Sequence, residues 1–367
     1  MPTADQYREA GLYDPRSDVV GRVELLDFLI GRGFTIDELV LANRHDGLGA
    51  IVADRMLVPT VLLSRAESIA RSDLAPDLFD ALSTGFGYLP LGHSPQGEIG
   101  YTDYDLSSFS TLAGFAEMFS YEEALAIVRV FGSSLARMAE ASVSLFLFDI
   151  ESRHIADLGT ELDLALKAEE AVSSLDTLMS AFEPVMRRQV MQAIERTRRA
   201  TIDASERLVY RYAIGFVDIV GFTSISGEMG GPELATFLRD FEARAFDAVT
   251  DAGARVVKLI GDEVMFAATN PGDTCRAAIQ LMEAFTTADG DVLPRGGVAY
   301  GDVLVRGGDY YGSTVNLASR LADEAVPQEV LVSGSVVETA TDCEFQPAGR
   351  RKVRGFPDPV AAWSIDA

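Results

Sequence analysis

Two stretches of the sequence each combine an apolar run with an aspartate close to a glycine. In residues 216–221, Asp218 stands among β-branched and aromatic residues, and Gly221 follows. In residues 256–263, a similar run leads to Gly261 and Asp262. β-Branched and aromatic residues favour buried strands. Because a lone carboxylate is costly to bury, each aspartate must be paired, hydrogen-bonded or bound to a cation at the end of its strand.

Two strand ends of this kind would form a site for hard divalent cations if they lay side by side. Two such ions favour phosphoryl chemistry because they bind the attacking oxygen and the triphosphate oxygens together. Gly221 supports this interpretation, since it lets the backbone approach a phosphate while the next amides face it from the start of a helix. The simpler interpretation is a helix-capping aspartate and a hairpin-turn aspartate, and each residue taken alone fits it.

Three separate motifs, in this order and spacing, closely resemble those of the class III nucleotidyl cyclases. They are residues 218–223, Lys258 with residues 261–263, and residues 309–320. The resemblance extends from about Ala204 to the C-terminus, a little under half of the chain. It implies an α+β fold with a ferredoxin-like (split βαβ) cyclase domain. The strands expected at 212–219, 297–305 and 330–333 and the helices expected at 232–252 and 273–286 fit that architecture.

The resemblance implies that the chain binds two divalent cations, Mg²⁺ or Mn²⁺. Asp218 and Asp262 would supply carboxylate ligands, and Ile219 would supply its backbone carbonyl. Phe222 and Thr223 follow Gly221, in the part that would face the substrate phosphates.

Lys258 and Asp309 match the positions that read the base in adenylyl cyclases. An ammonium and a carboxylate complement the acceptor at N1 of adenine and its amino group. Guanylyl cyclases have Glu and Cys there, so the match favours ATP. The chain also contains only three lysines, Lys167, Lys258 and Lys352, among 31 basic residues. A compact ammonium inside an apolar strand, in a chain that otherwise uses arginine, indicates a specific partner.

Asn316 and Arg320 are four residues apart, so a helix places both on one face. In the family, the Asn orients the ribose, the Arg stabilises the pentavalent phosphate, and both reach in from the other subunit. Arg295 and Arg354 match cations that bind the triphosphate, although the family usually has Lys where this chain has Arg354. Since one chain carries all of these positions, the resemblance implies a homodimer with two equivalent, shared sites.

With 367 residues, the chain is long enough for two domains. The first part has helical periodicity and no catalytic motif. We expect an all-α regulatory domain at 1–183, an Arg-rich linker helix at 184–207 and the catalytic domain at 208–367. We also expect helices at 59–72, 106–119 and 121–141, a helix from 155 into the 190s, and a loop at 85–101. Residues 31–33 should break a helical pattern before a helix capped by Thr35.

This layout resembles the actinobacterial, pH-sensing adenylyl cyclases, in which acid relieves autoinhibition. The linker concentrates arginines, and we expect it to dock on an acidic surface in one state and release it in another. A solvated helix is the alternative. The only histidines, His45, His93 and His154, lie on the regulatory side, where proton binding near neutral pH would act. Each of them also fits a surface or capping residue, and carboxylates whose pKa is raised by the acidic background could sense protons instead, so no single residue is assigned.

Composition excludes several classes of protein. A net charge of −25 argues against nucleic-acid binding, which needs a basic surface. Cys275 and Cys343 are the only cysteines, so no disulfide framework is expected. Residues 1–16 lack the apolar core of a signal peptide, and no apolar run is long enough to span a bilayer. We therefore expect a soluble, cytoplasmic protein.

The sequence thus predicts an adenylyl cyclase that converts ATP into 3′,5′-cyclic AMP and pyrophosphate. One alternative is a guanylyl or dual-specificity cyclase, which Lys258 and Asp309 disfavour. The other is a catalytically silent nucleotide-binding signalling module. Such modules usually lose a metal-binding aspartate or the Asn/Arg pair, and this chain retains both.

Overall fold

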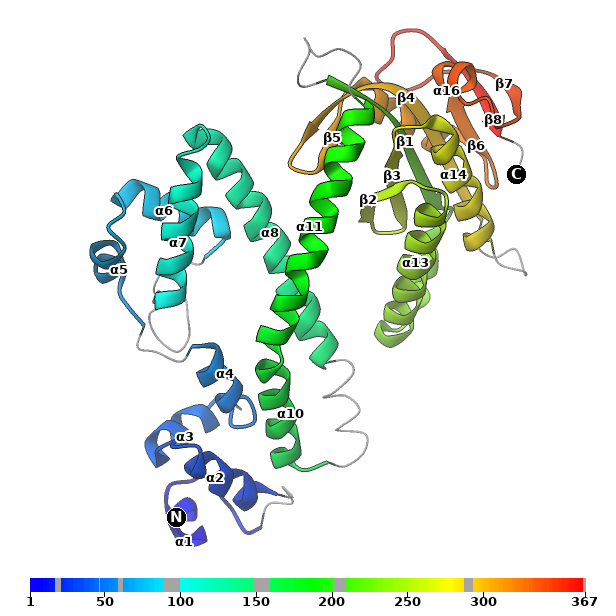
Figure 1. Cartoon of the computed structure of the whole chain (residues 1–367). Helices are drawn as coiled ribbons and strands as arrows, with labels where there is room; N and C mark the ends of the chain where they lie inside the picture. Colours follow the sequence, from blue (N-terminus) through cyan, green and yellow to red (C-terminus); the bar gives the residue numbers. More distant parts are fainter. Residues whose placement is uncertain are drawn as a thin grey trace. The chain divides into compact units, whose positions relative to one another are not determined.

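The computed structural model describes residues 1–16, 21–45, 47–58, 62–88, 100–147, 159–200, 209–286 and 293–365, without the side chains of residues 223–225. The chain divides into two compact units, Met1–Val185 and Met186–Ala367 (Figure 1). Within the described ranges, none of the helices combines the length and apolar character that a bilayer crossing requires.

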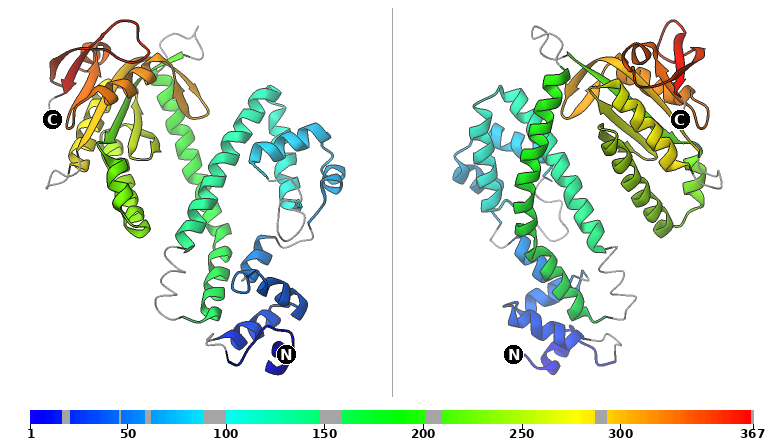
Figure 2. Two further views of the ribbon diagram at one scale, coloured as in Figure 1. Left: turned by 180° about the vertical axis from the view of Figure 1, so that it is seen from behind. Right: turned by 45° about the vertical axis from the view of Figure 1, so that its right-hand side comes forward.

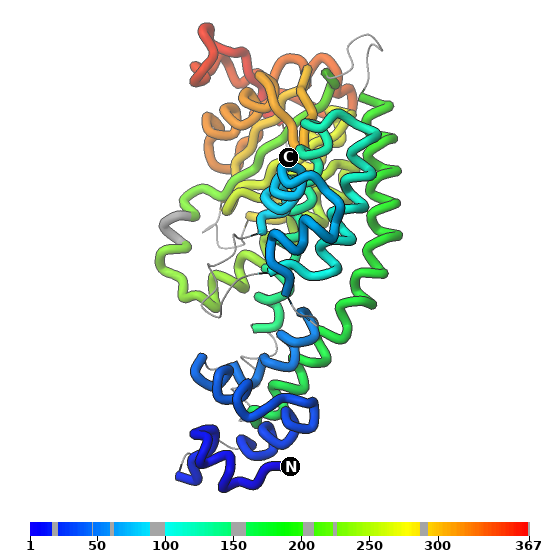
Figure 3. Tube along the Cα trace, turned by 90° about the vertical axis from the view of Figure 1, so that its left-hand side faces the viewer, coloured from blue at the N-terminus to red at the C-terminus, as the bar shows by residue number. Residues whose placement is uncertain are grey.

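The described part of the first unit is built from helices, which Figure 3 shows as a tube trace. They are α1 (Ala4–Glu9), α2 (Arg22–Gly31), α3 (Ile36–Asn43), α4 (Ile51–Leu57), α5 (Arg65–Ser72), α6 (Pro76–Phe86), α7 (Asp103–Ala116), α8 (Tyr121–Leu145), α10 (Glu161–Ser173) and the first part of α11 (Leu175–Ala200). The predicted break at residues 31–33 is confirmed, because α2 ends there. Thr35 then caps α3 by a reciprocal capping box with Glu38.

The first unit has two separate hydrophobic clusters. Tyr7, Leu25 and Leu39 belong to one, which also buries Ala165 of α10. Phe79 and Phe109 belong to the other, with ring centroids 5.1 Å apart.

Three local predictions for this unit need correction. The helix expected from residue 59 begins only at Arg65, because Ser64 forms a capping box with Glu67. The loop expected from residue 85 begins later, since α6 continues through Phe86. The single helix expected from residue 155 is interrupted between α10 and α11, where Ser174 caps α10. Residues 59–61, 89–99 and 155–158 lie outside the described ranges.

The second unit contains an eight-stranded sheet in the order β2-β3-β1-β4-β6-β8-β7, with β5 paired to β4. Its elements are β1 (Val209–Ile219), α12 (Phe222–Glu228), α13 (Gly231–Asp251), β2 (Arg255–Ile260), β3 (Glu263–Ala268), α14 (Pro271–Phe285), β4 (Pro294–Arg306), β5 (Asp309–Tyr311), α15 (Ser313–Glu324), β6 (Val330–Ser333), α16 (Gly334–Thr339), β7 (Phe345–Arg351) and β8 (Val360–Ile365). The order β2-β3-β1-β4, with α13 between β1 and β2 and α14 between β3 and β4, is the ferredoxin-like arrangement. The predicted α+β fold is confirmed.

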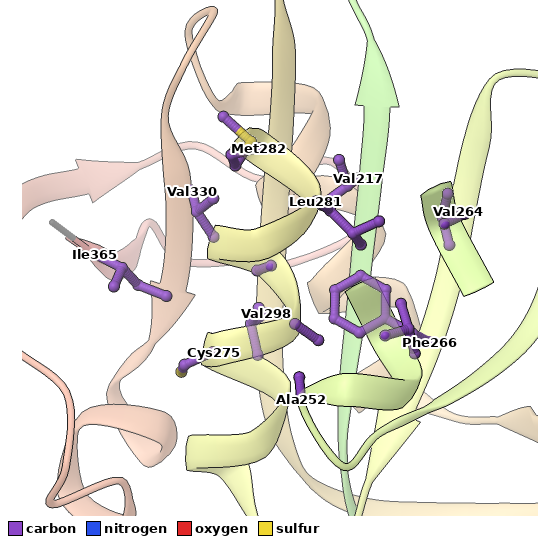
Figure 4. Close-up of a cluster of buried hydrophobic side chains, with 14 of the residues drawn as sticks. Val217, Ala252, Val264, Phe266, Cys275, Leu281, Met282, Val298, Val330 and Ile365 are labelled. Atoms are coloured by element: carbon purple, nitrogen blue, oxygen red, sulfur yellow. The ribbon is translucent and has the colours of Figure 1, made fainter. Parts of the chain in front are cut away.

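Alternate residues of the central strands face two different layers of helices. Val217 and Ile219 of β1 join the cluster formed with α13 and α14, which cover one face of the sheet (Figures 1 and 2). Figure 4 shows residues of this cluster, among them Cys275 and Leu281 of α14 and Phe266 of β3. The other β1 residues, such as those at 212, 214 and 216, face the cluster that includes α15. Asp218 shares their parity, so it lies on the α15 face.

Gly297 of β4 brings α15 close to the sheet. A Cβ atom at this position would lie 2.3 Å from the backbone nitrogen of Ala322 and 2.4 Å from the carbonyl oxygen of Ala318. These distances leave no room for a side chain. The strand therefore fixes the helix that carries Asn316 and Arg320.

Candidate active site

The structure brings Asp218, Ile219 and Asp262 together. Asp218 lies next to the end of β1, and Asp262 lies in the β2–β3 turn after Gly261, whose φ is 66°. Burial raises the pKa of Asp262, backbone hydrogen bonds from Asp262 itself and from Ile219 lower it, and the charge of Asp218 raises it. These contacts place both carboxylates and the end of β1 at one edge of the sheet.

Glu263 is a third carboxylate at this edge. It belongs to the second of the three motifs, but no role was predicted for it. It is the first residue of β3. Burial raises its pKa to about 7, and the negative charges of Asp218, Asp323 and Asp262 add to this effect. Its place directly after Asp262 was the only indication in the sequence, because the contribution of Asp323 depends on how α15 packs.

The residues at this edge fit a divalent cation. Carboxylate and carbonyl oxygens are the ligands that Mg²⁺ and Mn²⁺ prefer. No group of three or more His, Cys, Asp or Glu side chains suited to a metal occurs among the described residues. Two carboxylates do not fill the octahedral coordination of such an ion, so Asp218 and Asp262 would leave positions for other oxygens, such as those of a substrate phosphate.

Arg295 pairs with Asp218 in a bidentate geometry. Its Nε donates to Oδ1 at 3.0 Å and its Nη2 donates to Oδ2 at 3.1 Å. Arg295 Nη1 also donates to the backbone oxygen of Asp323 at 2.6 Å. The predicted triphosphate-binding cation thus contacts a predicted metal ligand.

The two residues predicted to read the base contact each other. Lys258 Nζ lies 2.5 Å from Oδ2 of Asp309, and both side chains are partly buried. The other oxygen of Asp309 accepts a hydrogen bond from the backbone N–H of Tyr310 at 2.8 Å. Lys258 comes from β2 and Asp309 from β5, so the fold joins them across 51 residues.

A second group of predicted residues lines a pocket of about 400 Å³ along α15. The pocket is formed by Ser313, Asn316, Arg320, Arg354, Gly355 and Phe356. Arg320 donates to Oδ2 of Asp323 at 2.7 Å. This pocket contains neither the strand-end carboxylates nor the Lys258–Asp309 pair. Arg295 is not among the residues that line this pocket, but it and the pocket residue Arg320 both contact Asp323.

Phe222 and Thr223 begin α12, directly after Gly221. The Phe222 ring stacks on Phe237, with centroids 5.4 Å apart, and packs against the core. A contact between Phe222 and a phosphate would therefore have to use its backbone. The side chain of Thr223 lies outside the described part of the structure.

The chain is similar in sequence to several known proteins. Residues 209–367 match the family described as the adenylate and guanylate cyclase catalytic domain. An adenylate cyclase of Streptomyces coelicolor is 34% identical over 84% of this chain and 77% of that protein. A Mycobacterium tuberculosis protein named a pH-sensitive adenylate cyclase is 26% identical over 94% of this chain and 87% of that protein. The match to the crystal structure of the adenylyl cyclase CyaB from P. aeruginosa covers 43% of this chain and 95% of the CyaB chain, with 22% identity and a TM-score of 0.40.

The raised pKa of Glu263 predicts a pH-dependent loss of stability. The folded state holds this proton up to about pH 7, whereas the unfolded chain releases it near the ordinary glutamate pKa of 4.5. Ionised Glu263 therefore destabilises the fold increasingly as the pH rises through this window. We expect Glu263→Gln to stabilise the second unit at pH 8 by on the order of 1–2 kcal/mol, after allowance for solvent screening, and by much less at pH 5.

Urea unfolding with a chelator present would measure this effect. Trp363, the only tryptophan of the chain, lies in β8 and reports on the second unit by its fluorescence. Glu338→Gln, on the exposed side of α16, is the matched control and should show no such difference between the two pH values. Equal effects of Glu263→Gln at pH 5 and pH 8 would contradict the assigned environment.

Proposed function

The chain belongs to the class III nucleotidyl cyclases, and we propose on this basis that it is an adenylyl cyclase converting ATP into 3′,5′-cyclic AMP and pyrophosphate. The observation that carries the proposal is the meeting of Asp218 and Asp262 at one edge of the sheet, where β1 and the β2–β3 hairpin end.

Asp218, Asp262 and the carbonyl of Ile219 would hold two divalent cations, Mg²⁺ or Mn²⁺. Such ions favour ionisation of the ribose 3′-hydroxyl and neutralise charge on the leaving pyrophosphate. The described site offers the 3′-hydroxyl no histidine base. The carboxylates at this edge provide the negative charge that attracts and orients the cations.

Selection of ATP would depend on Lys258 and Asp309. Their ion pair holds a donor and an acceptor 2.5 Å apart, and adenine presents the complementary acceptor at N1 and donor at its amino group. Guanine has a donor at N1 and an acceptor at O6, the reverse of adenine, so it would not match the ammonium of Lys258 and the carboxylate of Asp309. A buried polar group left unpaired in this way costs about 1–3 kcal/mol.

We propose that two copies of the chain share each site. Asn316 and Arg320 line the α15 pocket with Arg354, and none of the metal-binding or base-reading residues lines it. One copy would contribute the metal-binding residues, and the α15 pocket of the other would contribute Asn316 to the ribose and Arg320 to the reacting phosphate. The planar guanidinium of Arg320 stays charged throughout and suits a phosphate that gains negative charge.

We also propose that the chain has three parts, a regulatory domain at 1–183, an Arg-rich linker at 184–207 and a catalytic domain at 208–367. The linker would transmit regulation to the catalytic domain. The last turns of α11 belong to the second unit and pack on its sheet, where Ala200 is buried in the same cluster as Tyr212 and Tyr310. The Tyr212 and Tyr310 rings are 4.9 Å apart. Since Tyr310 directly follows Asp309, a shift of α11 would reach the base-reading residue.

Arg196 lies one turn before Ala200. Burial lowers the pKa of Arg196, as does the charge of Arg255. Arg255 in turn lies over the Tyr310 ring, 5.5 Å from its centroid. Two partly buried cations beside one tyrosine make this contact sensitive to a movement of the helix, which supports a regulatory role.

The nucleotide assay tests the proposed activity. Purified protein with Mn²⁺ should form cyclic AMP from ATP and much less cyclic GMP from GTP. Lys258→Glu combined with Asp309→Cys should lower kcat/KM for ATP by about 10–100-fold, because both groups that match adenine are lost. Lys352→Glu, at an exposed lysine outside the site, is the control. No cyclic product from either nucleotide would favour the silent signalling module, and an unchanged ATP preference in the double variant would exclude these residues from base reading.

The regulatory proposal predicts a change in the pH dependence of activity. Arg196→Ala in the full chain should raise the ratio of activity at pH 8 to that at pH 6 by roughly fivefold or more, because it loosens the contact through which the linker represses the enzyme. Arg199→Ala is the matched control, since Arg199 is exposed and pairs with Glu195 of the same helix at 3.0 Å. If the wild type, Arg196→Ala and Arg199→Ala had superimposable profiles of activity against pH, the contact of Arg196 would have no regulatory role.

A further inference from the structure

The bidentate pair between Asp218 and Arg295 follows directly from the strand register. Asp218 of β1 stands opposite Arg295 of β4 in the antiparallel ladder. Both side chains are mostly shielded from solvent, with exposed fractions of 21% for Asp218 and 26% for Arg295. The short cross-strand distance lets the guanidinium use both carboxylate oxygens, at 3.0 and 3.1 Å.

These two oxygens are also the ones that a cation at Asp218 would use. A bidentate arginine aligns with both oxygens of a carboxylate at once. A divalent cation at the same carboxylate would be close to the positive guanidinium and would be repelled by it. The ion pair and the cation therefore compete for Asp218.

Arg295 is held at this place by side-chain hydrogen bonds to Asp218 and to the backbone oxygen of Asp323, at 2.6 Å for the latter. To leave Asp218, its side chain has to exchange these bonds for a new partner. The resemblance places its guanidinium on the substrate triphosphate, which carries more negative charge than one carboxylate. A nucleotide would thus offer Arg295 a stronger partner at the moment when it brings its own oxygens to the metal site.

We propose that Arg295 makes cation binding at Asp218 depend on the nucleotide. Arg295 neutralises Asp218 until a triphosphate arrives, then transfers to the triphosphate and leaves the carboxylate to the cation. The cation alone binds weakly, and the cation and nucleotide bind cooperatively. The transfer to the triphosphate rests on the proposed function and on the triphosphate-binding role that the resemblance gives Arg295, whereas the competition at Asp218 rests on the ion pair alone.

The same two strands provide a matched control. Arg211 of β1 stands opposite Asp302 of β4, and Nε of Arg211 lies 3.0 Å from Oδ1 of Asp302. This second cross-strand pair is exposed, at 50% and 61% for the two side chains. Arg211→Gln removes an Arg–Asp pair from the same ladder without touching the site.

The first arm of the test measures Mn²⁺ binding to the full chain without nucleotide, by electron paramagnetic resonance of free Mn²⁺. Arg295→Gln should tighten Mn²⁺ binding by about tenfold or more, because a nearby cation shifts charge equilibria by this order. Arg211→Gln should leave it unchanged. Thermal unfolding of each variant verifies that the second unit is folded. Unchanged or weaker Mn²⁺ binding by folded Arg295→Gln would overturn the proposal.

The second arm adds 2′,3′-dideoxy-ATP, which lacks the 3′-hydroxyl and cannot be cyclised. In the wild-type chain this nucleotide should tighten Mn²⁺ binding by a much larger factor than in Arg295→Gln. Equal factors in both proteins would show simple repulsion without transfer and would also overturn the proposal. Both experiments measure Mn²⁺ binding and need no catalytic turnover. A failure to form cyclic AMP would contradict the proposed function, but the competition between Arg295 and Mn²⁺ at Asp218 would still be tested.

Discussion

The antiparallel pairing of β1 with β4 is the constraint on which the rest of the site depends. The ladder runs along all eleven residues of β1, from Val209 opposite Leu304 to Ile219 opposite Pro294. It places Asp218 opposite Arg295 at one end. It also places Gly297 where the backbone of α15 packs directly on the sheet. A slip by one residue would turn Asp218 into the α13–α14 core, where its charge would have no partner.

The same alternation explains on which side of the sheet the charged groups lie. One face of the central strands is covered by α13 and α14 and is apolar, as the cluster in Figure 4 illustrates. The charged groups are left to the strand ends and the α15 face. They comprise the carboxylate edge, the Lys258–Asp309 pair and the pocket of α15, and Asp323 contacts both Arg295 of the edge and Arg320 of the pocket.

The sequence predicted those features that depend on neighbouring residues. The strand ends at Asp218 and Asp262 were visible because apolar runs and glycines bracket them, and the Thr35 cap was visible for the same reason. The Asp218–Arg295 pair was not predictable, since it joins residues 77 apart through a register that no local pattern reveals. Nor were β7 and β8 predicted. The sequence of β7 is polar and contains Pro347 and Gly349 at a register shift, so it lacks the apolar alternation that predicts a strand.

Sharing of the site between two copies is the central claim, and mixing two inactive variants tests it most directly. One variant is Asp218→Ala and the other is Arg320→Ala, expressed together with different affinity tags. Random pairing should recover about a quarter of wild-type activity, because half of the dimers would hold one intact site of two. No recovery in dimers shown to contain both variants would place the complete site within a single chain and contradict the account.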